Sequence, residues 1–172
     1  MSRKPESLKK GDWIVHAYYG IGQIVGTETR SIGKNKAKYY KAKTPNSTFF
    51  IPTDNPINDR IRPLSSLYKL NKAKKILKEE PEEFPENHNE RRKLISEFTS
   101  DRSMDTSAQI IRDLIFRKHN KGLNDFEQKT LENTEALFVR EWAIIKDISE
   151  ENAKERLDKI IQEQVLQANR AE

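Results

Sequence analysis

The sequence contains no cysteine, and this absence excludes disulfide bonds, thiolate metal sites and a cysteine nucleophile. No apolar run approaches the roughly 18 residues of a membrane-spanning helix. The N-terminus is charged and lacks the apolar segment of a secretory signal; it reads MSRKPESLKKGD. Only 34% of the residues are hydrophobic, so no large core is available. These absences predict a cytoplasmic protein built from small folded pieces.

Acidic residues are scarce in the first part of the chain. Residues 1–75 carry 16 Lys/Arg against 5 Asp/Glu, a net charge of +11, whereas residues 76–172 carry 16 against 22, a net charge of −6. Most of these charges are expected to be solvated. A basic module joined to an acidic one nevertheless predicts two different surfaces and two partners.

The signatures of an enzyme are also missing. Gly20-Ile21-Gly22 lacks the third glycine of a dinucleotide-binding loop and is followed by strand-like residues, which favours a tight turn over a phosphate-binding loop. The three histidines, His16, His88 and His119, lie in different predicted elements without metal-ligand spacing. No serine lies in a Gly-x-Ser-x-Gly motif. We therefore predict a protein without catalytic residues, metal or cofactor.

Short β-like runs, rich in Ile, Val, Thr, Tyr and Phe, occupy the first part of the chain and are separated by turn residues. They cover residues 13–16, 21–29, 38–43, 48–52 and 60–64. Strands so few and so short suit a small, strongly bent barrel better than a sandwich. We predict an SH3- or Tudor-like antiparallel β-barrel over residues 1–65.

From residue 66 onward the apolar residues follow a helical period. The predicted helices are marked by the apolar face Leu67–Leu77, by Asn89–Phe98, by Ile110–Ile115 with a stop at Lys121-Gly122, by the capping-box spacing Asn124–Glu127 and by the cap Ser149. An acidic, proline-containing connector, residues 79–86, ends the first of them. We predict an all-α domain of about five helices over residues 66–172, and an α+β fold for the chain.

Two features point to binding rather than to structure alone. One is the cluster Arg91-Arg92-Lys93 at the start of a helix, where cations oppose the helix dipole. This placement favours contact with phosphate, the alternative being a solvated helix face. The other is an excess of aromatic and basic side chains on the β module, of types enriched at protein interfaces. They are Tyr18, Tyr19, Arg30, Tyr39, Tyr40, Phe49 and Phe50.

The order and spacing of several short motifs across both modules resemble the CarD/CdnL family of bacterial transcription regulators. In the β module the motifs are Gly11-Asp12-Trp13-Ile14-Val15, Gly20-Ile21-Gly22, Glu28-Thr29-Arg30, Tyr39-Tyr40, Ile51-Pro52 and Ile61-Arg62. In the helical half they are Ile110-Ile111-Arg112-Asp113-Leu114, Lys121-Gly122-Leu123, Glu127 and Glu141. The resemblance covers roughly residues 8–165.

This resemblance implies a non-enzymatic regulator of transcription. Its Tudor-like barrel is similar to the polymerase-interacting domain of the transcription–repair coupling factor, and would bind the β subunit of bacterial RNA polymerase. Its helical domain would contact promoter DNA, mostly the backbone and minor groove, at the upstream edge of the transcription bubble and modulate open-complex stability. The protein would then be cytoplasmic, nucleoid-associated through the polymerase, and monomeric.

The resemblance also assigns residues. Arg30 falls where the family places a polymerase-contacting arginine, Phe50 falls on a second contact that is often basic, and Tyr40 is predicted to join them. The expected DNA contacts on this basis are Asn87, His88, Arg91 and Lys93, to which the run of three cations adds Arg92.

Two positions depart from the family pattern on the DNA side. The family inserts a tryptophan from a Pro-x-Asn-Trp context, and here His88 stands at that wedge position. Glu90 replaces an arginine, and a carboxylate repels phosphate. We predict that polymerase binding is retained and that bubble stabilisation is weakened or retargeted.

Two other functions remain open at this stage. The basic β module could grip RNA or DNA directly, as a stand-alone SH3-like nucleic-acid-binding protein, which would bind nucleic acid in a strongly salt-dependent way without polymerase. A protein adaptor without a nucleic-acid role is the other alternative, and it would leave Arg91 and Lys93 dispensable.

Overall fold

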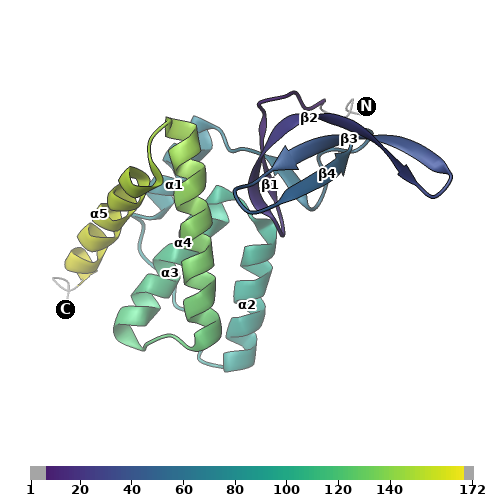
Figure 1. Cartoon of the computed structure of the whole chain (residues 1–172). Coiled ribbons are helices and arrows are strands. Elements are labelled where there is room, and N and C mark those ends of the chain that lie inside the picture. The colour runs from purple at the N-terminus through teal and green to yellow at the C-terminus, as the bar shows by residue number, and fades with distance from the viewer. Residues whose placement is uncertain (1–6, 169–172) are drawn as a thin grey trace, which may run out of the picture. The chain divides into compact units, whose positions relative to one another are not determined.

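The computed structural model describes residues 7–168 of the chain (Figure 1). The chain divides into two compact units, Met1–Leu64 and Ser65–Glu172. The outer limits of the two predicted domains, at residues 1 and 172, lie outside the described residues. No helix within residues 7–168 has the length and apolar character needed to cross a lipid bilayer.

The first unit is a five-stranded antiparallel sheet. Its strands are β1 (Trp13–His16), β2 (Gly20–Ile32), β3 (Asn35–Lys43), β4 (Thr48–Pro52) and β5 (Ile61–Pro63). Their order is β4-β3-β2-β1-β5, and β4 and β5 share no pairing among the described residues. The sheet is therefore open, rather than closed into the predicted barrel. The α+β class and the five strands are confirmed.

Alternation along the strands builds the core of this sheet on one face. Its buried members are Ile14, Ile24, Tyr40, Ala42, Phe49, Ile51 and Ile61. Gly22 lies on the same face, where a Cβ would come within 3.2 Å of the Phe49 ring. The Gly-Ile-Gly stretch thus serves packing and a turn, with Gly20, the first residue of β2, at a φ of +73°. This geometry does not support the alternative of a phosphate-binding loop at this stretch.

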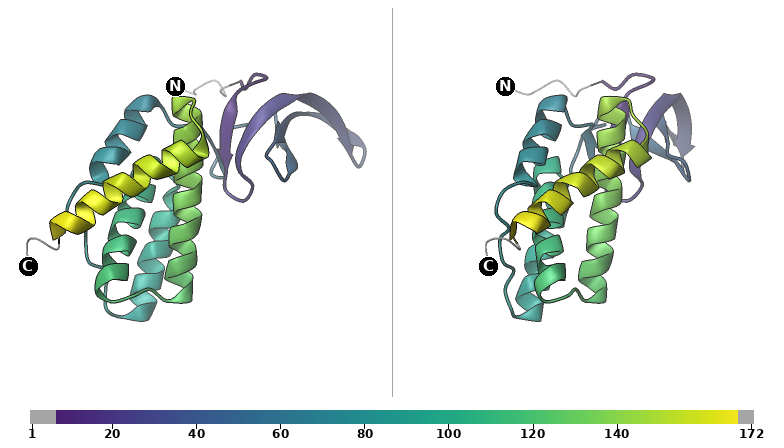
Figure 2. Two further views of the ribbon diagram at one scale, coloured as in Figure 1. Left: turned by 60° about the vertical axis from the view of Figure 1, so that its left-hand side comes forward. Right: turned by 90° about the vertical axis from the view of Figure 1, so that its left-hand side faces the viewer.

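Five helices make up the second unit, in agreement with the prediction. They are α1 (Leu67–Ile76), α2 (His88–Asp101), α3 (Met104–Asn120), α4 (Asp125–Lys146) and α5 (Glu150–Ala168). Helix α3 is central because it packs against α1, α2 and α4, and α5 packs on α4. Figure 2 shows α5 crossing the other helices obliquely. The largest fully buried side chains of this unit include Leu70, Ile95, Met104, Ile111, Leu114, Phe138 and Trp142.

Local sequence signals set the helix ends. The capping box predicted at α4 is present: the Asn124 side chain accepts from the Glu127 backbone N–H at 2.9 Å, and the Glu127 carboxylate accepts from the Asn124 N–H at 3.2 Å. Gly122 follows the end of α3 with a φ of +79°, as a left-handed residue after a helix requires. Ser149 caps α5 by accepting from the Asn152 N–H.

Candidate polymerase and DNA contact sites

The outer face of the sheet carries a small charged and aromatic group. The Arg30 guanidinium lies over the Phe50 ring, 3.9 Å from its centroid. Glu28 bridges two cations, with its carboxylate 3.9 Å from Arg30 Nε and 3.6 Å from Lys41 Nζ. The side chains of Arg30, Glu28 and Lys41 keep substantial solvent exposure, and Phe50 is half-buried. Two of the three predicted polymerase contacts, Arg30 and Phe50, are therefore brought together, although they come from strands on either side of β3.

The stacking of Arg30 on Phe50 has a physical consequence. A cation over an aromatic face is worth about 0.5–1 kcal/mol at an exposed site, which is enough to bias the guanidinium toward one orientation. The position that is often basic in the family thus carries a platform for Arg30 in this chain.

Tyr40, the third predicted contact, lies on the opposite face. It is only 8% exposed and packs in the core with Ala42 and Phe49. It is two residues from Ala42 on β3, and residues two apart in a strand face the same way. Tyr40 therefore supports the sheet from inside and does not share the outer face with Arg30 and Phe50.

The turn between β1 and β2 displays the most exposed aromatic residues of the sheet unit. Tyr18 is 76% exposed, and Tyr19 stacks on Phe49 with ring centroids 4.8 Å apart. His16 Nδ1 accepts the Tyr18 backbone N–H at 3.0 Å and so holds the turn. These tyrosines were singled out from the sequence as surplus aromatic residues, and Tyr18 indeed stands outside the core.

The start of α2 presents the predicted DNA-contacting segment. Asn87 is the N-cap, and its side-chain oxygen accepts from the backbone N–H groups of Asn89 at 2.9 Å and Glu90 at 3.2 Å. The Asn87 side chain is therefore used within the protein. His88 is the first residue of the helix and is exposed to solvent. The cap fixes the backbone from which His88 projects.

Arg91 is the largest difference from the predicted site. Its side chain is buried, with 6% of the residue exposed, and its Nε lies 2.5 Å from Glu127 Oε1. Its Nη1 donates to the carbonyl oxygens of Pro85 at 2.8 Å and Glu86 at 2.9 Å. The Arg91 guanidinium is thus bound inside the helical unit. If it pointed into solvent, the buried carboxylate of Glu127 would lose this partner, which would be costly. Arg91 is corrected from a DNA contact to an internal link.

Glu127 links three segments of the helical unit. Besides Arg91, it accepts from Arg117 Nε at 3.3 Å and from the Asn124 N–H. Burial acts to raise the pKa of Glu127, but the hydrogen bonds from Arg91 and Asn124 and the two nearby guanidinium groups outweigh it and lower that pKa. The carboxylate therefore stays ionised at neutral pH. We name the group Arg91, Glu127 and Arg117 the buried ion network.

The other two predicted cations lie at the surface. The Arg92 guanidinium lies 4.4 Å from the centroid of the Phe126 ring, which is contributed by the first turn of α4. Lys93 has a side chain 79% exposed, with a 3.9 Å ion pair to Glu97 one turn along α2. The three consecutive cations thus point in different directions, as the helical period of about 100° per residue requires.

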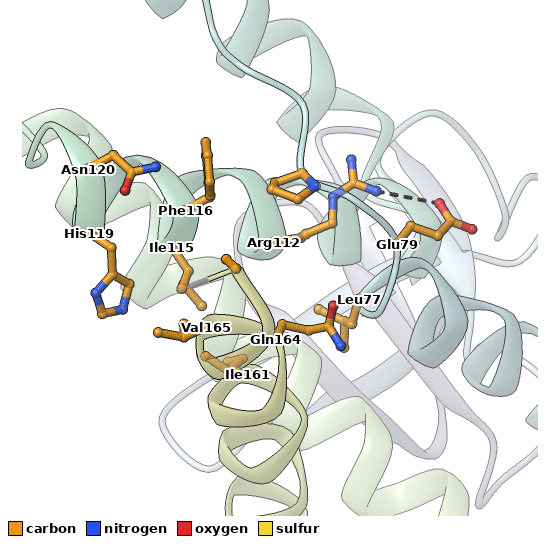
Figure 3. Close-up of a pocket in the computed structure, with 12 residues that line it drawn as sticks. Leu77, Glu79, Arg112, Ile115, Phe116, His119, Asn120, Ile161, Gln164 and Val165 are labelled. Carbon is orange, nitrogen blue, oxygen red and sulfur yellow. Dashed lines mark hydrogen bonds and ion pairs between the residues drawn. The ribbon is translucent and has the colours of Figure 1, made fainter. Parts of the chain in front are cut away.

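A pocket of about 120 Å³ opens between α3, α5 and the connector after α1 (Figure 3). Its floor is apolar and includes Ile115, Phe116, Ile161 and Val165. Its cation, Arg112, is neutralised by Asp113 at 2.6 Å and lies 3.4 Å from Glu79. Burial raises the pKa of Asp113 against the opposing effect of that arginine.

No group of three or more His, Asp or Glu within residues 7–168 is arranged to hold a metal ion.

Comparison with known proteins matches both units to one family. The family model described as "CarD, C-terminal domain" matches residues 72–158, and the one described as "CarD-like/TRCF RID domain" matches residues 8–65. The first of these alone covers more than half of the chain. The chain belongs to the CarD family.

The chain is also similar over most of its length to a bacterial protein. The chain is 28% identical over 146 residues to a protein of Bacillus subtilis (strain 168) named "Putative transcription factor YdeB". The alignment covers 84% of this chain and 95% of that protein. The similarity therefore extends through both units and is not confined to one of them.

In this CarD family chain, one feature of the sequence indicates that Arg91 is buried. Arg91 precedes Ile95 by four residues and therefore shares its helix face. Ile95 is fully buried. The helical period thus placed Arg91 on the inner side of α2, although the run of three cations suggested an exposed patch.

Proposed function

We propose that this CarD family protein is a non-enzymatic transcription regulator that binds the β subunit of bacterial RNA polymerase and contacts promoter DNA at the upstream edge of the bubble. The observation that carries the proposal is the presence of both family domains in one chain, in this order. The chain would act as a monomer in the cytoplasm and reach the nucleoid through the polymerase.

The sheet unit is proposed to make the polymerase contact. Arg30 and Phe50 support this role because the exposed guanidinium of Arg30 is held over the half-buried ring of Phe50 on the outer face. Arginine and aromatic side chains are the types that dominate binding energy at protein interfaces. Tyr40 is removed from the proposed contact, since it lies in the core on the other face.

The helical unit is proposed to contact DNA through the start of α2. The contact set is reduced to His88, Arg92 and Lys93, which are exposed, while Asn87 and Arg91 hold the segment in place. An imidazole can stack on a base, but it offers less area than the indole of the family pattern. We therefore expect the bubble to be stabilised less than by a tryptophan.

The polymerase contact is tested by charge reversal. Arg30→Glu is expected to weaken binding to the purified polymerase β subunit at least 30-fold, about 2 kcal/mol or more, because it removes a hot-spot arginine and places a carboxylate beside Glu28. The measurement is a titration of labelled protein by calorimetry or anisotropy. Lys36→Glu is the matched control, since it makes the same charge change on β3 of the same hairpin. Absence of binding by the wild type would overturn the proposed polymerase contact.

The DNA contact is tested at His88. His88→Ala is expected to shorten the lifetime of the polymerase open complex about fivefold, because loss of one stacked ring costs about 1 kcal/mol. Lifetimes are measured after adding a competitor that traps released polymerase. Asn89→Ala, a change at the neighbouring exposed residue, serves as the control. Equal lifetimes for the wild type and His88→Ala would exclude a wedge role for this residue.

A further inference from the structure

A second group of cations gathers on the helical unit away from the start of α2. Lys74 and Lys78 lie one turn apart on and just after α1, Lys146 is the last residue of α4, and Arg156 lies on α5. Lys74 Nζ lies 5.2 Å from the centroid of the Trp142 ring. This contact joins α1 to α4, and Lys146 lies one turn after Trp142 on the same face of α4. We call these four residues the α1–α4–α5 basic surface.

Carboxylates of the described part of this unit do not form ion pairs with the basic surface. The unit Ser65–Glu172 has 20 Lys/Arg and 22 Asp/Glu, enough carboxylates to pair its cations. It does pair many of them, as in Lys72–Asp105, Arg91–Glu127, Lys121–Glu86 and Lys154–Asp158. Within residues 7–168, however, none of the four cations of the basic surface is ion-paired with a carboxylate.

The other three cations of the basic surface act on Lys74. Partial burial, and then repulsion from Lys146, Lys78 and Arg156, lowers the pKa of Lys74. The charged neighbours that act on this amine are thus all of its own sign. Like charges held together in this way are destabilising in the isolated protein, and an anionic partner would relieve the repulsion.

We propose that the α1–α4–α5 basic surface binds the phosphate backbone of duplex DNA, as a contact separate from His88 at the start of α2. The proposal rests on the proposed function, because it takes promoter DNA as the polyanion that this unit meets. It adds a sequence-independent contact from a different set of helices, of the kind that positions a protein on DNA without reading bases.

The surroundings of the surface favour DNA over an acidic protein segment. Protein interfaces have an apolar core inside a polar rim. In the described part of the helical unit, the large exposed apolar side chains are Leu67 and Tyr68 in the first turn of α1 and Leu166 near the end of α5. None of them lies in the turns that carry the four cations, and Trp142 beneath Lys74 is buried. Charge is therefore the main means of recognition here.

The test compares two triple variants of the full chain by titrating a labelled, short blunt-ended DNA duplex at several salt concentrations. The first variant is K78Q/K146Q/R156Q, which spares Lys74 and its packing on Trp142. The second is K34Q/K36Q/K38Q, which removes the same charge from the exposed β2–β3 hairpin. Circular dichroism establishes that both variants are folded.

We expect the first variant to bind about tenfold or more weakly at about 50 mM salt, and the slope of log affinity against log salt to fall by about 2–3, since each lost phosphate contact removes about 0.9 from that slope. The hairpin variant should keep most of the wild-type affinity and most of the wild-type salt slope. Three results would overturn the proposal. They are an equal loss of affinity in the two variants, a wild type that shows no salt-dependent binding to the duplex, and displacement of the labelled duplex by a polyglutamate peptide as effectively as by unlabelled duplex. The proposed function is judged separately, by polymerase β binding and open-complex lifetime, so either can fail alone.

Discussion

Replacing Arg91 with alanine is expected to lower the free energy of unfolding of the helical unit by about 3 kcal/mol or more. The change removes one member of a buried ion pair and leaves the Glu127 carboxylate desolvated, a situation that costs about 3–5 kcal/mol. It also takes the donor from the Pro85 and Glu86 carbonyl oxygens. Arg117 and Asn124 still donate to Glu127, which places the expected loss at the lower end of that range.

The measurement is urea unfolding of the full chain at neutral pH, followed by the helical circular dichroism signal. The matched control is Arg92→Ala, the next residue, whose guanidinium lies over Phe126 at the surface. It should cost no more than about 1 kcal/mol. The double variant Arg91→Met, Glu127→Gln should recover part of the stability, because it leaves no buried charge unpaired within this pair. Equal costs for Arg91→Ala and Arg92→Ala would show that the buried ion network contributes no special stability.

The second large effect is expected at Trp142. This side chain is 2% exposed and meets Phe138 edge-on, with ring centroids 6.1 Å apart. Lys74 covers it from α1. Trp142→Ala removes the largest buried side chain of the unit and leaves a cavity where α4 packs, which is expected to cost about 3–5 kcal/mol.

The same unfolding measurement tests this expectation. Tyr68→Ala truncates an aromatic residue of the same unit that is 77% exposed, and it should change stability by no more than about 0.5 kcal/mol. Trp142→Phe should fall between the two, because it keeps part of the packed ring. A loss below about 1.5 kcal/mol for Trp142→Ala would mean that the surrounding helices close the cavity.

Much of the fold could be predicted from local signals. The capping box at Asn124 and Glu127, the glycine after α3 and the change from strand to helical period near residue 66 depend on neighbours within a few residues, and the structure contains all of them. Closure of the sheet depends instead on whether β4 and β5, which are distant in sequence, come to pair. No local residue pattern specifies whether these two strands pair. The sequence therefore predicted a closed barrel, whereas the structure has an open sheet.

The candidate sites show the same division. Arg30 and Phe50 could be chosen by resemblance, but their contact across β3 depends on strand register and sheet twist. Tyr40 is one of the surplus aromatic residues, and Arg91 belongs both to the run of three cations and to the family pattern. Their burial depends on which face of the strand or helix they occupy. The alternation with Ala42 and the four-residue spacing to Ile95 carried that information, and composition alone did not.

The two hydrogen bonds from Arg91 reach main-chain oxygens, and the path of the backbone before α2 is therefore independent of which side chain stands at position 88. A single nucleotide-level change at this position can exchange the tip residue without refolding the protein. The stability of this segment and the proposed DNA contact therefore depend on different side chains, Arg91 and His88. The backbone that presents position 88 can therefore stay the same while the side chain at its tip changes.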